Sequence, residues 1–268
     1  MPSFDKVIRP RRAAMIVDVA KLLAERNLIC GLLEIDVTNV RRRLRELNRE
    51  GAEVSFTAWI TKVVADCVAR HPQTQAMLHG RRRMVVFQDV DIALPVEKLV
   101  GGIRQPLPLL IRECNMKSVR EINQEIKAFK NFSIIDESEY FKQQQNLPEI
   151  VQSIYYHLPK SLRSAILRRL LFNPFSAKRY SGTVFVTTVN AVGNLKGWNL
   201  PTRPNCNLSI ALGSVAEKPW VVNGEIKIRQ ILNLTISMNH DVIDGVPARQ
   251  FTQDLVNEIE NNTSAILG

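Results

Sequence analysis

Hydrophobic and polar residues alternate most strictly over residues 231–239, ILNLTISMN. Successive side chains of a β-strand point to opposite faces, so this period of two predicts a strand with one apolar and one polar face. Just before it, residues 220–228 carry Asn223-Gly224, a pair that supplies the two positive-φ positions of a type I′ turn. The C-terminal third is therefore expected to contain a β-hairpin followed by a long strand.

The rest of the chain mixes strand and helix patterns. Short β-like runs occupy residues 84–87, 90–96, 182–189 and 208–215. Apolar residues at helical spacing occupy 38–50, 56–70, the stretch after the Ser118–Glu121 capping box, and a C-terminal helix with Phe251, Leu255 and Ile259 in register. Thr38 is the expected N-cap of the first of these helices. The pattern indicates an α/β chain.

Residues 136–180 differ from the rest of the chain. Apolar and cationic residues alternate there at helical spacing, with Pro159 and Pro174 as breaks. We interpret this segment as an added helical element within a single domain that spans 1–268.

Composition limits the possible classes of protein. With 268 residues and 45% hydrophobic content, the chain is long enough to bury a full core. No apolar run approaches the ~18 residues of a membrane span, and the N-terminus lacks the apolar core of a secretory signal. The four cysteines are far apart in the sequence, so a reduced, cytoplasmic protein is expected.

The formal net charge of +10 invites comparison with nucleic-acid-binding proteins. The basic residues are nevertheless scattered in short groups without interleaved aromatic residues, so nucleic acid is not expected as a partner. A phosphate-bearing substrate fits the charge equally well. A membrane-surface helix over 148–172 is a less favoured alternative to a helix packed on the protein itself.

The strongest chemical signal is His240-Asp241-Val242-Ile243-Asp244-Gly245, where the predicted strand gives way to a helix. A neutral imidazole held at a strand end can accept a proton from a thiol, hydroxyl or amine that attacks a thioester. Asp244 can hold the turn through an ion pair or a cap. Taken alone, the motif is equally consistent with a structural strand-end histidine. The other histidines lack metal-ligand spacing, so no metal is expected.

Several segments, in order along the chain, resemble the catalytic domain of the dihydrolipoamide acyltransferases of 2-oxo acid dehydrogenase complexes. These segments are 32–40, 55–76, 89–96, 109–126 and, most closely, 221–251. The resemblance implies a chloramphenicol acetyltransferase-like fold and CoA-dependent acyl transfer, with coenzyme A as a substrate. It places the catalytic histidine at His240 and the structural aspartate at Asp244. It also places an oxyanion-stabilising hydroxyl at Thr187, or at Thr188 if the strand is shifted by one residue.

The resemblance further implies a homotrimer, with each site shared between two chains, and allows a larger cage of trimers. An arginine among Arg9, Arg11 and Arg12 is expected to pair with Asp244. The chain departs from the family in carrying Asn239 and Asp241 around His240. Asp241 could act on His240, tune an acceptor or simply face solvent, and the last of these is expected. The chain also shows no lipoyl domain and no covalently bound lipoyl group is expected.

Three functions remain open at this stage. The first is acyl transfer from acyl-CoA to a small thiol, hydroxyl or amine, with residues 146–175 covering the acceptor end of the site. The second is transfer to a separate lipoylated carrier acting in trans. The third is a non-catalytic oligomeric scaffold, which the presence of His240, Asp244 and a hydroxyl-bearing strand makes less favoured.

Overall fold

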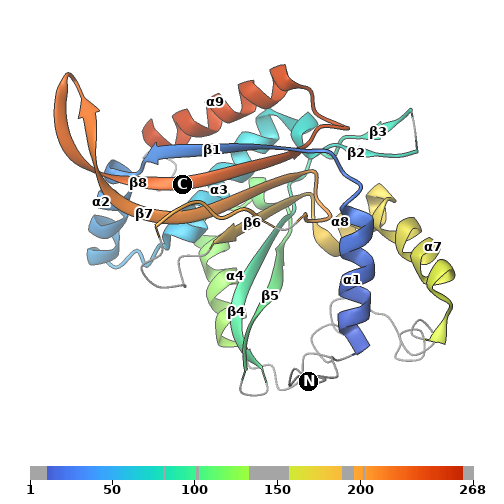
Figure 1. Cartoon of the computed structure of the whole chain (residues 1–268). Helices are drawn as coiled ribbons and strands as arrows, with labels where there is room; N and C mark the ends of the chain where they lie inside the picture. The colour runs from blue at the N-terminus through green and yellow to red at the C-terminus, as the bar shows by residue number, and fades with distance from the viewer. Residues whose placement is uncertain are drawn as a thin grey trace, which may run out of the picture.

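The computed structural model of the chain describes residues 11–80, 82–100, 103–132, 157–188, 196–201 and 203–261. Its centre is a mixed sheet in the order β1-β8-β7-β6-β4-β5 (Figure 1). The strands of this sheet are β1 (Leu28–Asp36), β4 (Ile92–Val100), β5 (Ile103–Ile111), β6 (Val184–Thr188), β7 (Leu208–Val222) and β8 (Glu225–Asn239). The short strands β2 (Met77–Leu78) and β3 (Met84–Val85) pair separately. The sheet is mixed because β6 runs parallel to β4 and β7, whereas the remaining pairs are antiparallel.

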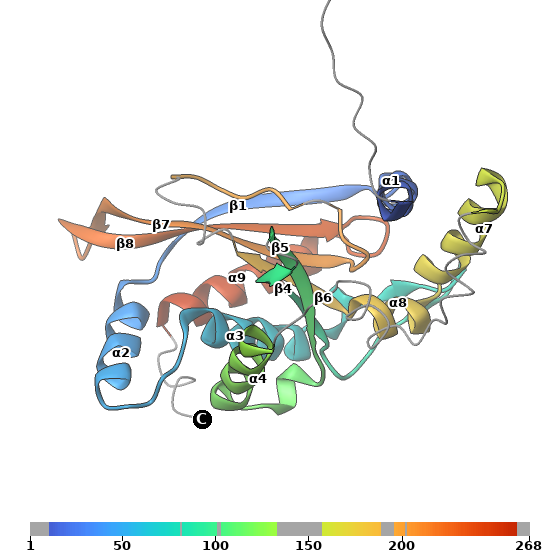
Figure 2. The same cartoon turned by 90° about the horizontal axis from the view of Figure 1, so that it is seen from below.

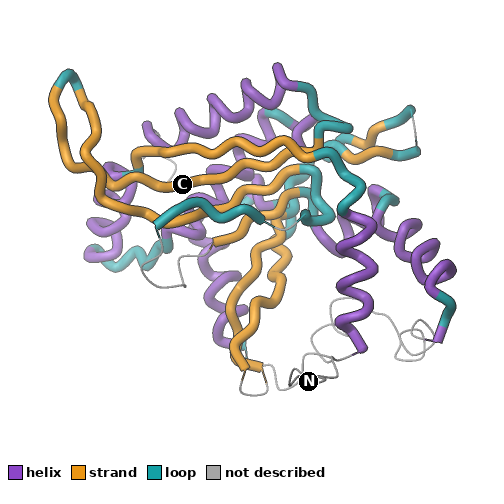
Figure 3. The backbone as a smooth tube through the Cα atoms, viewed as in Figure 1, coloured by secondary structure: helices purple, strands orange, loops and turns teal. Residues whose placement is uncertain are grey.

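Four helices cover one face of the sheet, as the view from below shows (Figure 2). They are α2 (Thr38–Arg49), α3 (Phe56–Arg70), α4 (Val119–Asn131) and α9 (Gly245–Asn261). The core lies between these helices and the apolar face of the strands, and Trp59 and Phe251 are its largest fully buried side chains. The opposite face is crossed by the loop of residues 196–201 (Figure 3), where the Trp198 indole Nε1 donates to the Leu33 carbonyl at 3.0 Å.

The predicted hairpin is confirmed and is longer than the pattern indicated. Asn223 and Gly224 have φ values of 53° and 79° and form the turn between β7 and β8. The runs predicted at 208–215 and 220–222 are one strand, β7, which is interrupted only by an irregularity between Leu212 and Val215. Such a bulge breaks the alternation that sequence reading relies on.

Two local expectations were wrong. The residue before the first turn of α2 is Val37, so Thr38 is not the N-cap; its hydroxyl instead donates to the Asp36 carboxylate at 2.6 Å. The run at 84–87 is only the two-residue strand β3. The Ser118–Glu121 capping box of α4 is confirmed in both of its hydrogen bonds.

The other α-helices that the structure describes lie at one end of the sheet (Figure 1): α1 (Arg11–Leu23), α7 (Lys160–Leu171) and α8 (Pro174–Ser181). Helix α7 follows Pro159 and α8 begins at Pro174, so both prolines end or begin helices as expected. Ion pairs join α7 to the first helix region: Arg163 to Asp18 at 3.3 Å and Arg168 to Glu25 at 2.7 Å. Residues 136–156 of the predicted added element lie outside the described residues.

Among the helices that the structure describes, none is long and apolar enough to cross a membrane. All four cysteines are free thiols. Burial raises the pKa of Cys67, Cys114 and Cys206 to about 12 in each case, so these thiols stay protonated near neutral pH.

Candidate active site

His240 lies in the turn between β8 and α9, and its backbone is fixed by contacts from two other strands' ends. Its N–H donates to the carbonyl of Asn27, the residue before β1, at 2.7 Å. The preceding residue, Asn239, donates from its backbone N–H to the Asn207 carbonyl at 2.9 Å, just before β7 begins. The turn is therefore tied to the sheet on both sides, which holds the histidine at a defined position.

The imidazole of His240 is exposed, and its ring orientation is set by one hydrogen bond. Nδ1 lies 2.8 Å from the Ile243 carbonyl oxygen. Because a carbonyl can only accept, Nδ1 must carry the proton, and in the neutral ring Nε2 is then the unprotonated nitrogen. The local fold thus presents Nε2 as a proton acceptor, which is the state that a general base requires.

Asp241 is exposed, as expected, but it also contacts the chain. Its Oδ1 accepts a hydrogen bond of 2.7 Å from the Asn27 side-chain amide, which links the His240 turn to the start of β1. The neighbouring Arg26 is buried, with its guanidinium donating to the Cys206 carbonyl at 3.2 Å and to the Asn205 side chain at 3.0 Å. Burial lowers the pKa of Arg26, and the charge of Asp241 opposes this shift. No sequence pattern pointed to Arg26 or Asn27.

Asp244 caps the start of α9 through its backbone, whose carbonyl accepts from the Ala248 N–H at 3.1 Å. Its side chain is exposed and forms no ion pair with any side chain that the structure describes. Of its three expected partners, Arg9 lies outside the described residues and the side chains of Arg11 and Arg12 are not described, so that pairing stays a prediction.

Thr187 and Thr188 lie at the end of β6 on opposite faces of the sheet. Thr188 is in register with Leu212, which is fully buried under the helices, whereas Thr187 is in register with Ala211 on the other face. Both threonine side chains are half-buried. Because oxyanion stabilisation requires a hydroxyl that another molecule can reach, the face away from the core supports Thr187 as the first candidate.

His240 and Thr187 are not brought together within one chain. Through Ala211, Thr187 is in register with Thr235, and His240 lies five residues beyond Thr235, just past the end of β8. At about 3.3 Å per residue along a strand and about 4.8 Å between strands, the two residues are roughly 19 Å apart. A site that uses both side chains must therefore combine two chains.

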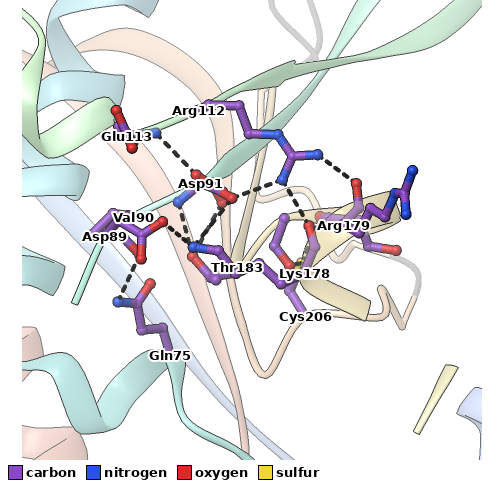
Figure 4. Close-up of polar contacts among 12 residues, drawn as sticks. Gln75, Asp89, Val90, Asp91, Arg112, Glu113, Lys178, Arg179, Thr183 and Cys206 are labelled. Atoms are coloured by element: carbon purple, nitrogen blue, oxygen red, sulfur yellow. Dashed lines mark hydrogen bonds and ion pairs between the residues drawn. The ribbon is translucent and has the colours of Figure 1, made fainter. Parts of the chain in front are cut away.

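A buried carboxylate, that of Asp91, anchors α8 to the sheet next to the start of β4 (Figure 4). Asp91 is almost fully buried, accepts from the Glu113 N–H at 2.9 Å and forms an ion pair of 2.8 Å with Arg112. Arg112 also donates to the Lys178 carbonyl at 3.0 Å and to the Arg179 carbonyl, which satisfies the C-terminal end of α8. These contacts fasten α8 to the edge between β4 and β5.

No group of three or more His, Cys, Asp or Glu side chains suited to hold a metal ion occurs in the part of the chain that the structure describes. The arrangement around His240 instead offers an imidazole base, amide groups and a buried guanidinium. These groups suit proton transfer to and from a bound organic substrate.

The chain is similar to known proteins over most of its length. The family model of the 2-oxoacid dehydrogenases acyltransferase (catalytic domain) matches residues 7–132 and 181–267. The lipoamide acyltransferase component of the branched-chain alpha-keto acid dehydrogenase complex of Bacillus subtilis is 22% identical over 242 residues, which are 87% of this chain and 47% of that protein. The chain thus spans about half the length of this curated relative.

Solved structures show the same fold at low sequence identity. The cubic core of the pyruvate dehydrogenase multienzyme complex matches with a TM-score of 0.67 and 15% identity, covering 98% of this chain and 94% of that chain. Chloramphenicol acetyltransferase matches with a TM-score of 0.50 and 12% identity, covering 96% and 100%. The predicted chloramphenicol acetyltransferase-like fold is confirmed. With most of its length matched by the family model, the chain belongs to the 2-oxoacid dehydrogenase acyltransferase (catalytic domain) family.

Proposed function

We propose that this chain is a CoA-dependent acyltransferase in which His240 is the general base. The observation that carries the proposal is the contact of 2.8 Å between His240 Nδ1 and the Ile243 carbonyl, because it leaves Nε2 as the proton acceptor in the neutral ring. Membership of an acyltransferase family supports the same conclusion. The donor is an acyl-CoA thioester, and the acceptor is a small thiol, hydroxyl or amine.

In the proposed reaction, one proton moves from the acceptor to His240 and then from His240 to the CoA sulfur. Nε2 of His240 removes the proton of the acceptor as its nucleophilic atom attacks the thioester carbonyl. A bond from that atom to carbon forms, and the carbonyl oxygen gains the negative charge of a tetrahedral intermediate. The hydroxyl of Thr187 donates a hydrogen bond to this oxygen. When the carbon–sulfur bond breaks, the CoA thiolate leaves and takes the proton back from the imidazolium.

The separation of His240 and Thr187 supports a shared site. If both act on one carbonyl, the threonine must come from a neighbouring subunit, which favours a homo-oligomer. A trimer is the state that the family resemblance implies. A cage built from trimers is a further expectation that rests on apolar residues 265–267, which lie outside the described residues.

A lipoylated carrier acting in trans is the second candidate acceptor. It is favoured by the name of the Bacillus subtilis relative, a lipoamide acyltransferase component. A carrier domain would need open access to the His240 turn, whereas a free small molecule could reach it through a narrower opening.

A panel of acyl-CoAs tests the proposal directly. Binding should raise the melting temperature for the preferred acyl-CoA, since a ligand that binds only the folded state stabilises it. Adding small thiols, amines, or a separately prepared lipoylated domain should then release free CoA. If no acyl-CoA binds and no acceptor causes CoA release, the proposed function is wrong.

A further inference from the structure

A cavity of about 220 Å³ borders the turn that carries His240. It lies where the start of β1, the end of β8, the β2 ribbon and the corner between α7 and α8 meet. The lining residues are Glu25, Arg26, Met77, Leu78, Leu171, Phe172, Pro174, Ala177, Asn207, Asn239 and Asp241. Asn239 and Asp241 are the residues on either side of His240 in the chain, so the cavity lies against the turn that carries the proposed base, although the His240 side chain itself does not line it.

The outer wall of the cavity is the corner between α7 and α8, and it is fixed from both sides. On the α7 side, Arg168 forms its ion pair of 2.7 Å with Glu25. On the α8 side, the Asn173 side chain caps the helix by accepting from the Ser176 N–H at 3.1 Å. The Asp91 cluster anchors the far end of α8 (Figure 4). The corner is therefore a preformed wall, and little ordering is needed when a ligand enters.

The floor of the cavity is equally constrained. The Arg26 guanidinium is held by backbone carbonyls of Pro204 and Cys206 at 3.1 and 3.2 Å and lies 5.6 Å from the centre of the Phe172 ring. Asn239 donates from its side chain to the Asn207 side chain at 3.2 Å. These polar groups already have hydrogen-bond partners within the chain. The rest of the lining consists chiefly of apolar side chains from the end of α7, the start of α8 and β2.

The size of the cavity limits what it can hold. Sites for whole cofactors or drug-sized ligands usually occupy about 300–1,000 Å³, so this cavity is too small for an entire CoA molecule. We propose that this cavity binds a short aliphatic group attached to the reacting carbonyl or to the attacking atom, an assignment that rests on the function proposed above. Phe172 and Ala177 set the length of the group that fits.

Substitutions of two phenylalanines, one that lines the cavity and one that does not, test this assignment. Phe172→Ala should enlarge the cavity and shift the preference toward longer chains by about tenfold or more in relative kcat/KM, the usual value of one or two methylene groups in an apolar pocket. Phe175→Ala is the matched control, because Phe175 is exposed, belongs to the same corner and does not line the cavity. The control should keep the wild-type chain-length profile.

The opposite change should have the opposite effect. Ala177 is buried against the cavity, so Ala177→Met should fill it and penalise long chains while sparing the shortest. Each variant is measured with straight-chain acyl-CoAs of two to eight carbons and one acceptor, and then with alkanethiols of increasing length and acetyl-CoA. A shift in the first series assigns the cavity to the acyl group, and a shift in the second assigns it to the acceptor.

A readout that needs no turnover separates this inference from the proposed function. The rise in melting temperature is recorded for each acyl-CoA and each alkanethiol with the wild-type protein and the three variants. A length dependence that moves with Phe172→Ala or Ala177→Met supports the cavity even if no acyl transfer occurs. If neither variant changes the length dependence of binding or of rate in either series, the inference is overturned, while His240 can still be the base.

Discussion

At the scale of single residues, His240 shows what spacing in a sequence can and cannot reveal. The motif and the predicted strand placed His240 and Asp244 in one turn, and the structure has them there. The contacts that hold the turn come from Asn27 and Asn207, which are far away in the sequence; Asn27 and Asp241 are 214 positions apart. No local pattern encodes a pairing of that separation. For the same reason the buried Arg26 was not predicted.

The choice between Thr187 and Thr188 is a residue-scale prediction. Thr187→Ala should lower kcat by ~10²–10³, the usual cost of losing one oxyanion donor, because its side chain lies on the sheet face away from the core. Thr188→Ala is the matched control, being the same substitution one residue away on the core face. Steady-state rates of CoA release distinguish them. If Thr188→Ala is the damaging variant, the assignment of the oxyanion donor is off by one residue.

At the scale of elements, patterns predicted the helices α2, α3, α4 and α9 and the hairpin better than the edge strand β5. Pro106 and Pro108 argue against a strand in a sequence, yet β5 is the last strand of the sheet, where a missing N–H donor is tolerated. Helix α1 was not predicted either. The sequence alone does not show that residues 103–111 lie at the edge of the sheet, and this position is what allows them to form a strand despite the two prolines.

The segment around α7 and α8 carries the element-scale prediction. Deleting residues 146–175 should change the relative rates with different acceptors more than it changes the affinity for acyl-CoA, because Leu171, Phe172 and Pro174 border the His240 turn. The family model matches the chain on both sides of 133–180, so this segment is where specificity particular to this chain is expected. Rates with a set of thiols and amines, beside acyl-CoA titrations, provide the comparison. Unchanged relative rates in a folded deletion variant would contradict this role.

At the scale of the whole molecule, the sheet places the two proposed catalytic side chains roughly 19 Å apart in one chain, by the strand spacings already given. A reaction that uses both side chains therefore requires association between subunits. Sedimentation should show a trimer or a multiple of it. Mixed oligomers of His240→Ala and Thr187→Ala subunits should recover activity that neither parent has, because some sites then receive an intact residue from each chain. A fully active monomer would contradict this prediction.

The most direct test of the central claim is the rate of CoA release by His240→Ala, measured with the preferred acyl-CoA and acceptor. Loss of a general base should lower turnover by ~10²–10⁴ while the circular dichroism spectrum and melting temperature stay close to wild type. His79→Ala is the matched control, because His79 is an exposed histidine between β2 and β3 that does not line the cavity, and it should keep wild-type turnover. Turnover by His240→Ala equal to that of His79→Ala would exclude His240 as the general base.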